Sequence, residues 1–386
     1  MKKCDENGLP GLDPMHRMIF RSIFLEGAAA EDHFRRWIDS VDFDAIDYTS
    51  YRMVPMLFER FSHLREENPY HGRMKGIRQY FLYKNTLTVK ALADYAAALN
   101  RAGITPLLFK GAACMLEYYP NPSLRPLGDA DVLVERKNIG KAAGILEGLG
   151  FIPKYDTHMR RKIRHSVDYI NGSNLAIDLH ISTLHSDLRR GADRALIKRA
   201  SERSFEGSAV RLPSPEDIFL TSCVSGIREI AGNYTIQNTQ WLMDCKLIIE
   251  KEQALDWRFI VCEANRRKTG LDLFIALKLL SEVDERLVPA FVFDELEDAG
   301  NLCKALIVER YRTLGVNPFK PSAFDIRLKW TLHTYRDDHN IAVMLATFPA
   351  FIIRNFRLDH YYQIPSFVIK NVWRRLGGRS AGRAEK

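Results

Sequence analysis

The six cysteines of this 386-residue chain follow no metal-binding or redox spacing. No CxxC pair or zinc-finger pattern occurs, and the cysteines lie far apart in the sequence. This scatter argues against a disulfide-stapled secreted scaffold and against a cysteine-based zinc site. We therefore expect reduced, mostly buried thiols and a cytoplasmic protein. The cysteines are Cys4, Cys114, Cys223, Cys245, Cys262 and Cys303.

Long apolar runs are also missing. The longest, Ile341–Ile353, is interrupted by Thr347 and Pro349 and is too short to span a bilayer. The first residues, MKKCDENGLPGLDPMHR, contain two lysines followed by acids, glycines and prolines instead of the apolar core of a signal peptide. These features argue against a transmembrane helix in this run and against a signal peptide.

The chain has no internal repeat and no low-complexity tract, and its composition is that of a soluble globular protein. Hydrophobic residues make up 46% and charged residues 27% of the sequence. The length allows one large domain or two to three ordinary ones. The net charge of +8 suits a polyanionic ligand such as a nucleotide, a nucleic acid or an acidic membrane surface. A role in solubility alone is the alternative.

The first third of the chain has helical periodicity, and the pattern changes after about residue 100. Apolar residues recur every three or four positions from residue 14 onward, and Gly103 is a plausible helix stop. The compact apolar run Ile104–Gly111 then predicts a strand. The segment AACMLEYYP predicts a helix that ends at Pro120, and DADVLVE (Asp129–Glu135) alternates as a strand does.

Further strands are predicted downstream, before a return to helices. Asn138 can cap the helix IGKAAGILEGLG, and FIPKYD, HSVDYING and NLAIDLHIS read as strands with a turn at Asn171-Gly172. SPED, which begins at Ser214, resembles a capping box and leads into the predicted helix IFLTSCVSGIREIAG. Other helices follow, among them IQNTQWLMDCKLIIEKE.

The pattern as a whole predicts an α+β fold with a small mixed β-sheet. We expect a core at residues 100–210, an N-terminal helical segment at 1–99 and a C-terminal helical domain with a basic tail at 211–386.

Paired aspartates at the start of one predicted strand form the candidate metal site. Asp129 and Asp131 point to the same face, because residues i and i+2 of a strand do so. Asp178 lies in AIDLH, and a neighbouring strand would bring its carboxylate to the first two. Carboxylates suit Mg²⁺, which binds them together with substrate phosphates. A second pair, Asp42 and Asp44, is interpreted as surface or capping acids.

A lysine-glycine turn precedes the acid pair. Gly111 would let backbone amides approach a phosphate, and the following helix offers its N-terminus to an anion. Lys110 and Arg125 are candidate triphosphate contacts, Arg125 by bidentate binding. A surface lysine and an arginine that pairs with the aspartates are the alternatives.

Two histidines lie near the predicted site. His180 points to the face of Asp178 and away from that of Leu179, so it is a candidate nucleotide contact. A structural histidine bonded to neighbouring backbone is the alternative. His165, at the start of HSVDYI, could reach the same face.

The stretch LLFKGAACMLEYYPNPSLRPLGDADVLV resembles the uncharacterised nucleotidyltransferase family of the DNA polymerase β superfamily. The motifs that carry the resemblance are Lys110-Gly111, the run Arg125–Asp131 (RPLGDAD) and Asp178-Leu179-His180. SPEDIFLTSCVSG and QWLMDCKLII, with the family's W-L-x-D signature at Trp241 and Asp244, extend it to roughly residues 95–250.

The chain departs from the family pattern at four places, one of which is a helix before the acids that is longer than in minimal members. Lys110-Gly111 replaces the superfamily's glycine-serine pair, and Ile181 stands where the family has tryptophan. Residues 223–226 (CVSG) occupy a segment that contains histidine in the family. These departures concern the nucleotide and the acceptor more than metal binding.

The resemblance implies a transferase that binds Mg²⁺, or Mn²⁺ in its place, at Asp129, Asp131 and Asp178. It would move a nucleoside monophosphate from an NTP such as ATP to a hydroxyl group, and release pyrophosphate. One metal ion would activate the hydroxyl and the other would hold the triphosphate, with Asp178 as ligand or general base. The acceptor would be a small molecule or a protein, and nucleic acid is less favoured because no RNA-binding motif is visible.

Two other functions stay open on the sequence alone. One is a catalytically inactive nucleotide-binding or regulatory protein with the same fold. The other is a membrane-surface interaction protein that uses the aromatic and arginine-rich C-terminal segment, FIIRNFRLDHYYQIPSFVIKNVWRRLGGR. The basic cluster Arg160, Arg161, Lys162 and Arg164 is either a solvated loop or a contact for an acidic acceptor. Packing and capping are the expected roles of Trp241 and Asp244.

Overall fold

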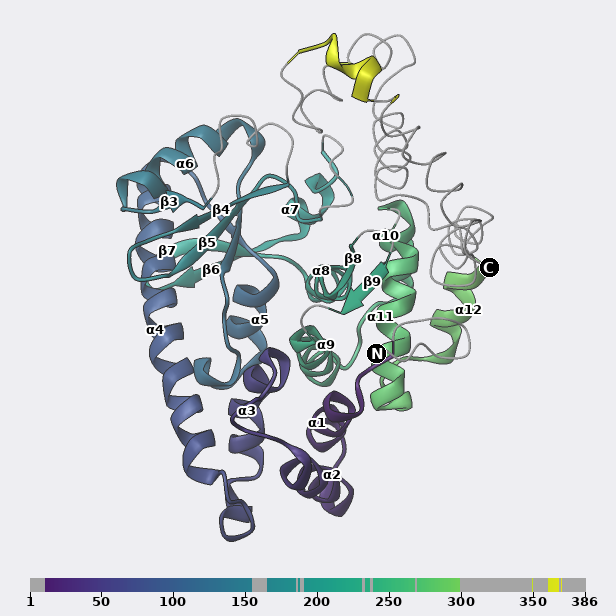
Figure 1. Cartoon of the computed structure of the whole chain (residues 1–386). Helices are drawn as coiled ribbons and strands as arrows, with labels where there is room; N and C mark the ends of the chain where they lie inside the picture. Colours follow the sequence, from purple (N-terminus) through teal and green to yellow (C-terminus); the bar gives the residue numbers. More distant parts are fainter. Residues whose placement is uncertain are drawn as a thin grey trace, which may run out of the picture.

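The computed structural model describes most of the chain up to residue 298 and short stretches beyond it (Figure 1). The described residues are 11–154, 165–184, 187, 191–230, 233–236, 239–267, 269–298, 349, 360–367 and 369. The basic cluster at residues 160–164 and most of the C-terminal aromatic segment lie outside them.

The N-terminal part is helical, as predicted. Its helices are α1 (Pro14–Phe24), α2 (Gly27–Ser40), α3 (Tyr48–Arg60) and the 31-residue α4 (His71–Arg101). Asp13 caps α1 by accepting a hydrogen bond from the backbone of Met15, and Asp47 caps α3. After α4 the chain turns at Gly103, which has a φ of +75° that favours glycine.

A seven-stranded mixed sheet follows, which confirms the predicted α+β class. Its order is β3-β4-β5-β2-β1-β7-β6. β2 is parallel to β5 and antiparallel to β1, and β1 is parallel to β7. The strands are β1 (Leu107–Leu108), β2 (Ala130–Leu133), β3 (Ile152–Pro153), β4 (Ser166–Ile170), β5 (Ala176–His180), β6 (Ser201–Phe205) and β7 (Ser208–Leu212).

The two faces of the sheet meet different helices. Val132 belongs to the main core, where α4 lies beside α6 (Figure 1), whereas Leu133 packs with Leu196 of the short helix α7 (Arg194–Arg199). Asp131 shares the face of Leu133, because alternate residues of a strand point the same way. The candidate acids therefore lie on the α7 face. Helix α5 (Lys110–Tyr118) precedes β2 in the chain, and helix α6 (Ile139–Gly148) follows it.

The C-terminal helices pack beside the sheet (Figure 1). They are α8 (Pro215–Gly226), α9 (Gln240–Lys251), α10 (Trp257–Arg266), α11 (Gly270–Val283) and α12 (Ala290–Asp298). Ser214 caps α8 through the backbone of Asp217, in agreement with the predicted capping box. No helix of the described residues is long and apolar enough to cross a membrane.

Two local predictions were wrong, and the hairpin predicted at Asn171-Gly172 is confirmed with a longer loop. The helix predicted to run through IREIAG ends at Gly226, and the hairpin of β8 (Ile227–Ile230) and β9 (Asn233–Ile236) follows it. The Asn171-Gly172 turn is a longer loop, in which the Asn171 side chain accepts from two backbone amides and Asn174 has the positive φ. Asn138 precedes α6 without a capping side-chain hydrogen bond.

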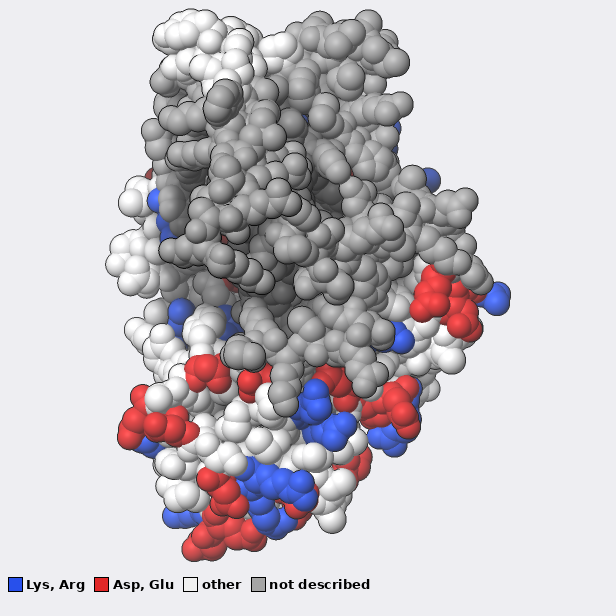
Figure 2. Space-filling view, turned by 45° about the vertical axis from the view of Figure 1, so that its right-hand side comes forward, with Lys and Arg blue, Asp and Glu red and all other residues white. Residues whose placement is uncertain are grey.

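The described surface mixes both signs of charge. Figure 2 shows lysines and arginines interspersed with acids over the described part of one face. The net charge of +8 is therefore not gathered there into a single basic field.

Of the described cysteines, Cys114, Cys223 and Cys245 are buried and free, as predicted, whereas Cys262 is exposed.

Candidate active site

The parallel pairing of β2 with β5 brings two aspartates side by side. Asp131 is the direct neighbour of Asp178 in the register of the two strands. Both are buried, with 5% and 8% of the residue exposed, respectively. A buried pair of like charges is unfavourable unless cations or hydrogen bonds compensate it, so the surroundings of this pair decide its chemistry.

His180, which is fully buried, bridges the two carboxylates. Its Nε2 lies 2.8 Å from Oδ1 of Asp131 and 2.9 Å from Oδ2 of Asp178. On the other side of the ring, Nδ1 donates to the backbone carbonyl of Ser182 at 3.1 Å. The imidazole and the Phe109 ring also make a T-shaped contact, with their centroids 4.8 Å apart. The imidazole is thus fixed from both nitrogens.

Lys110 supplies the second cation. Its Nζ lies 2.6 Å from Oδ1 of Asp131, and 18% of its side chain is exposed. Lys110 is also the first residue of α5 and has a φ of +48°, a conformation that costs a non-glycine residue free energy. Strain of this kind is most frequent at functional sites.

The pKa values follow from this arrangement. Burial raises the pKa of Asp131, but the Lys110 ammonium and the hydrogen bond from His180 outweigh it and hold that pKa below its usual range. Burial and Lys110 lower the pKa of His180, but the carboxylates of Asp178 and Asp131 outweigh them and raise it to about 9. For Asp178, burial is outweighed by His180, so its pKa is lowered. Without a metal ion, the imidazolium and the Lys110 ammonium therefore together balance the two carboxylates.

Asp129 stands at the rim of the same site, one residue before β2. The residue is exposed to solvent, although protein atoms lie close enough to desolvate its carboxyl group. This desolvation and the charge of Asp131 raise the pKa of Asp129 to about 6, against the opposing effect of Lys110. Asp129 is thus coupled electrostatically to the other four side chains of the site, Lys110, Asp131, Asp178 and His180.

One atom of the site is left without a partner. Within the described part of the chain, Oδ1 of Asp178 is buried and accepts no hydrogen bond. Asp131, Asp178 and His180 each offer a ligand atom, and these atoms all lie within 4.8 Å of one another. Asp129 is not in this group. Two carboxylates with an unpartnered oxygen fit a hard divalent cation such as Mg²⁺.

Arg125 does not reach the carboxylates. Its guanidinium binds Asp244 of α9 in a bidentate way, at 2.8 Å from Nε and 2.6 Å from Nη2. Tyr119 donates to the same carboxylate at 2.8 Å. A Cβ at Gly111 would lie 2.6 Å from Nη1 of Arg125. The glycine of the lysine-glycine turn therefore makes room for this arginine.

Two further buried side chains hold the loop before Asp129, and the sequence reasoning missed both. Asn85 of α4 donates to the carbonyl of Arg125 at 2.8 Å and accepts from the backbone of Leu127 at 3.1 Å. Arg52 of α3 donates to the carbonyl of Pro126 at 2.5 Å. The sequence signal for such a role is Asn85 itself, a polar residue in the middle of a long predicted helix.

The remaining sequence candidates have structural contacts. Asp244 pairs with Arg125 instead of capping a helix, and Trp241 packs over Gly226. His165 lies near His180, with ring centroids 5.4 Å apart, and its carbonyl accepts from Ile181.

The comparisons with known proteins give a family and two distant structural likenesses. No curated protein matches the sequence. The antibiotic-resistance factor ANT(2'')-Ia matches with 13% identity and a TM-score of 0.28, over 66% of this chain and 100% of that one. An antigenic nucleotidyltransferase-like protein from Paracoccidioides brasiliensis matches with 18% identity and a TM-score of 0.30, over 52% of this chain and 93% of that one.

The family match covers the sheet, the site and α3 to α11. The family is described as "Uncharacterised nucleotidyltransferase", and the match spans residues 49–283, more than half of the 386 residues. The chain therefore belongs to this uncharacterised nucleotidyltransferase family.

Proposed function

We propose that the protein transfers a nucleoside monophosphate from an NTP to a hydroxyl group of a small-molecule or protein acceptor, with Mg²⁺ as the cofactor. The observation that carries this proposal is the pairing of Asp131 with Asp178, where Oδ1 of Asp178 is buried without a partner. This arrangement supports the metal site implied by the resemblance to the polymerase β superfamily.

Each residue has a distinct role in the proposed site. Asp131 and Asp178 would hold the cation, and Asp129 at the rim would add a carboxylate toward the triphosphate. His180 would give up its bonds to the two carboxylates and stay oriented by the Ser182 carbonyl. A bound Mg²⁺ supplies charge neutralisation for the triphosphate and for the attacking oxygen.

Lys110 is suited to the phosphates because, among the described residues of the site, it is a cation whose side chain is partly exposed. With a divalent cation at Asp131, the lysine ammonium would be available to the β- and γ-phosphates. The backbone amides at the start of α5 lie beside it and favour an anion. Arg125 keeps its bonds to Asp244 and so orders the loop that carries Asp129.

The proposed reaction is a single displacement at the α-phosphorus of the NTP. The acceptor oxygen forms a bond to the α-phosphorus, while the bond from that phosphorus to the bridging oxygen breaks and pyrophosphate leaves with the electron pair. The hydroxyl proton passes to the carboxylate of Asp178. Positioning and electrostatic stabilisation supply most of the rate enhancement in such transfers.

A thermal-shift panel of ATP, CTP, GTP and UTP, each with and without Mg²⁺, tests the proposal. We expect stabilisation that requires both Mg²⁺ and at least one NTP, and that is lost in the Asp129→Asn/Asp131→Asn variant. The absence of any nucleotide effect at millimolar concentration would contradict it.

The chain contains its own matched control. Asp42 and Asp44 have the same DxD spacing but are exposed, and Asp42 caps a turn by accepting from the backbone of Asp44. The Asp42→Asn/Asp44→Asn variant removes the same number of charges. It should keep the full stabilisation by Mg²⁺ and NTP.

A further inference from the structure

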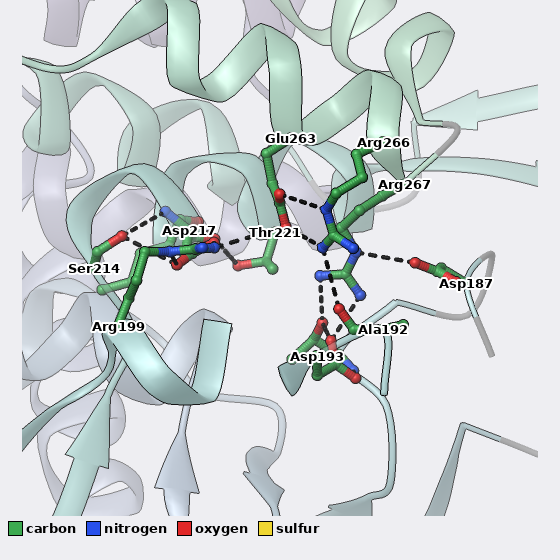
Figure 3. Close-up of polar contacts among 12 residues, drawn as sticks. Asp187, Ala192, Asp193, Arg199, Ser214, Asp217, Thr221, Glu263, Arg266 and Arg267 are labelled. Atoms are coloured by element: carbon green, nitrogen blue, oxygen red, sulfur yellow. Dashed lines mark hydrogen bonds and ion pairs between the residues drawn. The ribbon is translucent and has the colours of Figure 1, made fainter. Parts of the chain in front are cut away.

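A buried arginine holds the loop that follows β5. Arg267 comes directly after α10, and only 1% of it is exposed. Its Nη1 donates to Oγ1 of Thr183 at 3.0 Å, and its Nη2 donates to Oδ1 of Asp193 at 2.7 Å. Its Nε donates to Oδ2 of Asp187 at 3.3 Å. Figure 3 shows this guanidinium pointing from α10 toward both aspartates.

The contacts of the loop lead from Arg267 to the site. Asp193 also accepts from the backbone amide of Thr183 at 3.1 Å. The neighbouring Ser182 donates its hydroxyl to the carbonyl of Asp187 at 2.8 Å. The carbonyl of the same serine accepts from Nδ1 of His180 at 3.1 Å. A continuous series of hydrogen bonds and short backbone links thus joins the guanidinium to the imidazole.

Stability alone is a weak explanation for this arginine. Burying a guanidinium and two carboxylates carries a large desolvation cost, and well-packed apolar side chains often stabilise a fold equally well. What a buried, planar guanidinium adds is geometry, because its donors are fixed relative to one another and bind three acceptors at once. The residues that it binds lie three to thirteen positions beyond β5.

We propose that Arg267 is a positioning residue of the active site: it holds Thr183, Asp187 and Asp193 so that the carbonyl of Ser182 orients His180 against Asp131 and Asp178. The relevance to catalysis rests on the proposed function. The orientation of the His180 ring is independent of the proposed function and can be measured separately.

Arg199 offers a matched control. It is a second arginine of the same network, and it binds Asp217 in a bidentate way at 2.9 and 2.8 Å (Figure 3). Within the described residues, it makes no hydrogen bond to the loop after β5. Its loss removes the ion pair of a partly exposed arginine, whose side chain is 30% exposed, without touching the path to His180.

The test combines two measurements on the full-length protein labelled with ¹⁵N-histidine. Ring ¹H–¹⁵N spectra, with His180 assigned through His180→Gln, report its hydrogen bonds, and electron paramagnetic resonance titration reports Mn²⁺ affinity. We expect Arg267→Met to shift the His180 ring signals and to alter Mn²⁺ affinity about tenfold, which is the size of effect found for side chains that contact metal ligands. Arg199→Met should leave both measurements at wild-type values. Wild-type ring signals in folded Arg267→Met would overturn the proposal.

A second variant serves if Arg267→Met does not fold. Thr183→Val removes only the hydroxyl between Arg267 and Asp193 and leaves their 2.7 Å ion pair in place. It should shift the same ring signals by a smaller amount, and unchanged signals would again contradict the inference. If the wild type binds no Mn²⁺ at all, the metal site of the proposed function fails, while the ring signals still decide the role of Arg267.

Discussion

At the scale of residues, the buried charges around the site are held by specific partners. Arg125 and Asp244 have 9% and 2% of their side chains exposed, and both oxygens of the aspartate are bonded. Burial alone would lower the pKa of the guanidinium, but Asp244 outweighs it and raises the pKa of Arg125 above its usual range. The pair connects α9 to the loop that carries Asp129.

Removing one partner of this pair should be costly. We expect Asp244→Ala to lower the free energy of unfolding by about 3–5 kcal/mol, because it leaves Arg125 buried and uncompensated. Tyr119→Phe removes only a hydroxyl donor to the same carboxylate, and it should cost about 1 kcal/mol. Urea unfolding of the two variants measures both values. Equal effects would show that the ion pair is not the main contact.

A pH effect is expected from Asp47, the cap of α3. Burial raises its pKa, but hydrogen bonds from His16 and Ser50 outweigh burial and hold it below the ordinary value of 3.8. A depressed folded-state pKa stabilises the protein above the unfolded-state pKa, and this stabilisation is lost as the pH falls through the folded-state pKa.

The Asp47→Asn variant should therefore lose less stability than the wild type between about pH 5 and pH 2. The difference is small because half of the Asp47 side chain is exposed. Ser50→Ala, which removes one of the hydrogen bonds, should fall between the two proteins. Parallel acid-unfolding curves for all three would contradict this expectation.

At the scale of elements, local patterns predicted most helices and the strands at the site. Alternation and turn residues identify β2 and β5, and the caps of α3 and α8 are single polar residues before apolar periodic runs. The β6–β7 hairpin was missed because SERSFEGSAVRL is short and polar. Its turn signal is the pair Glu206-Gly207, both with positive φ.

The end of α8 shows why the helix prediction failed there. IREIAG has no strong helix breaker, but Gly226 meets the Trp241 ring of α9 so closely that a Cβ would lie 2.2 Å from the indole nitrogen. The contact between two helices thus fixes where the helix stops, and that information is not local in sequence.

We expect Gly226→Ala to destabilise the protein by about 1–3 kcal/mol, because the added methyl group must displace a buried indole. The matched control is Gly144→Ala in α6, where a Cβ would meet nothing within 4 Å. This second change should be neutral or stabilising by about 0.5–1 kcal/mol, since alanine favours the helix. Thermal unfolding compares the two. A similar effect of both changes would show that the Trp241 contact is unimportant.

At the scale of the whole molecule, the site depends on parts that are distant in sequence. The spacing of Asp129 and Asp131 is local and could be predicted from the sequence, as could Lys110. The partner of Arg125 lies 119 residues away, and the arginine that holds the loop after β5 lies 84 residues from Thr183. Such pairings arise only when the C-terminal helices pack beside the sheet. Local patterns in one sequence therefore do not reveal them.

The position of a divalent cation tests the central claim most directly. Crystals grown with MnCl₂ and a non-hydrolysable NTP analogue would give an anomalous difference map in which manganese is unambiguous. We expect a peak bonded to Asp131 and to the presently unpartnered Oδ1 of Asp178, with the His180 ring displaced from both carboxylates. A map without a peak between these carboxylates, with His180 still bridging them, would contradict the proposed metal site and the transferase activity built on it.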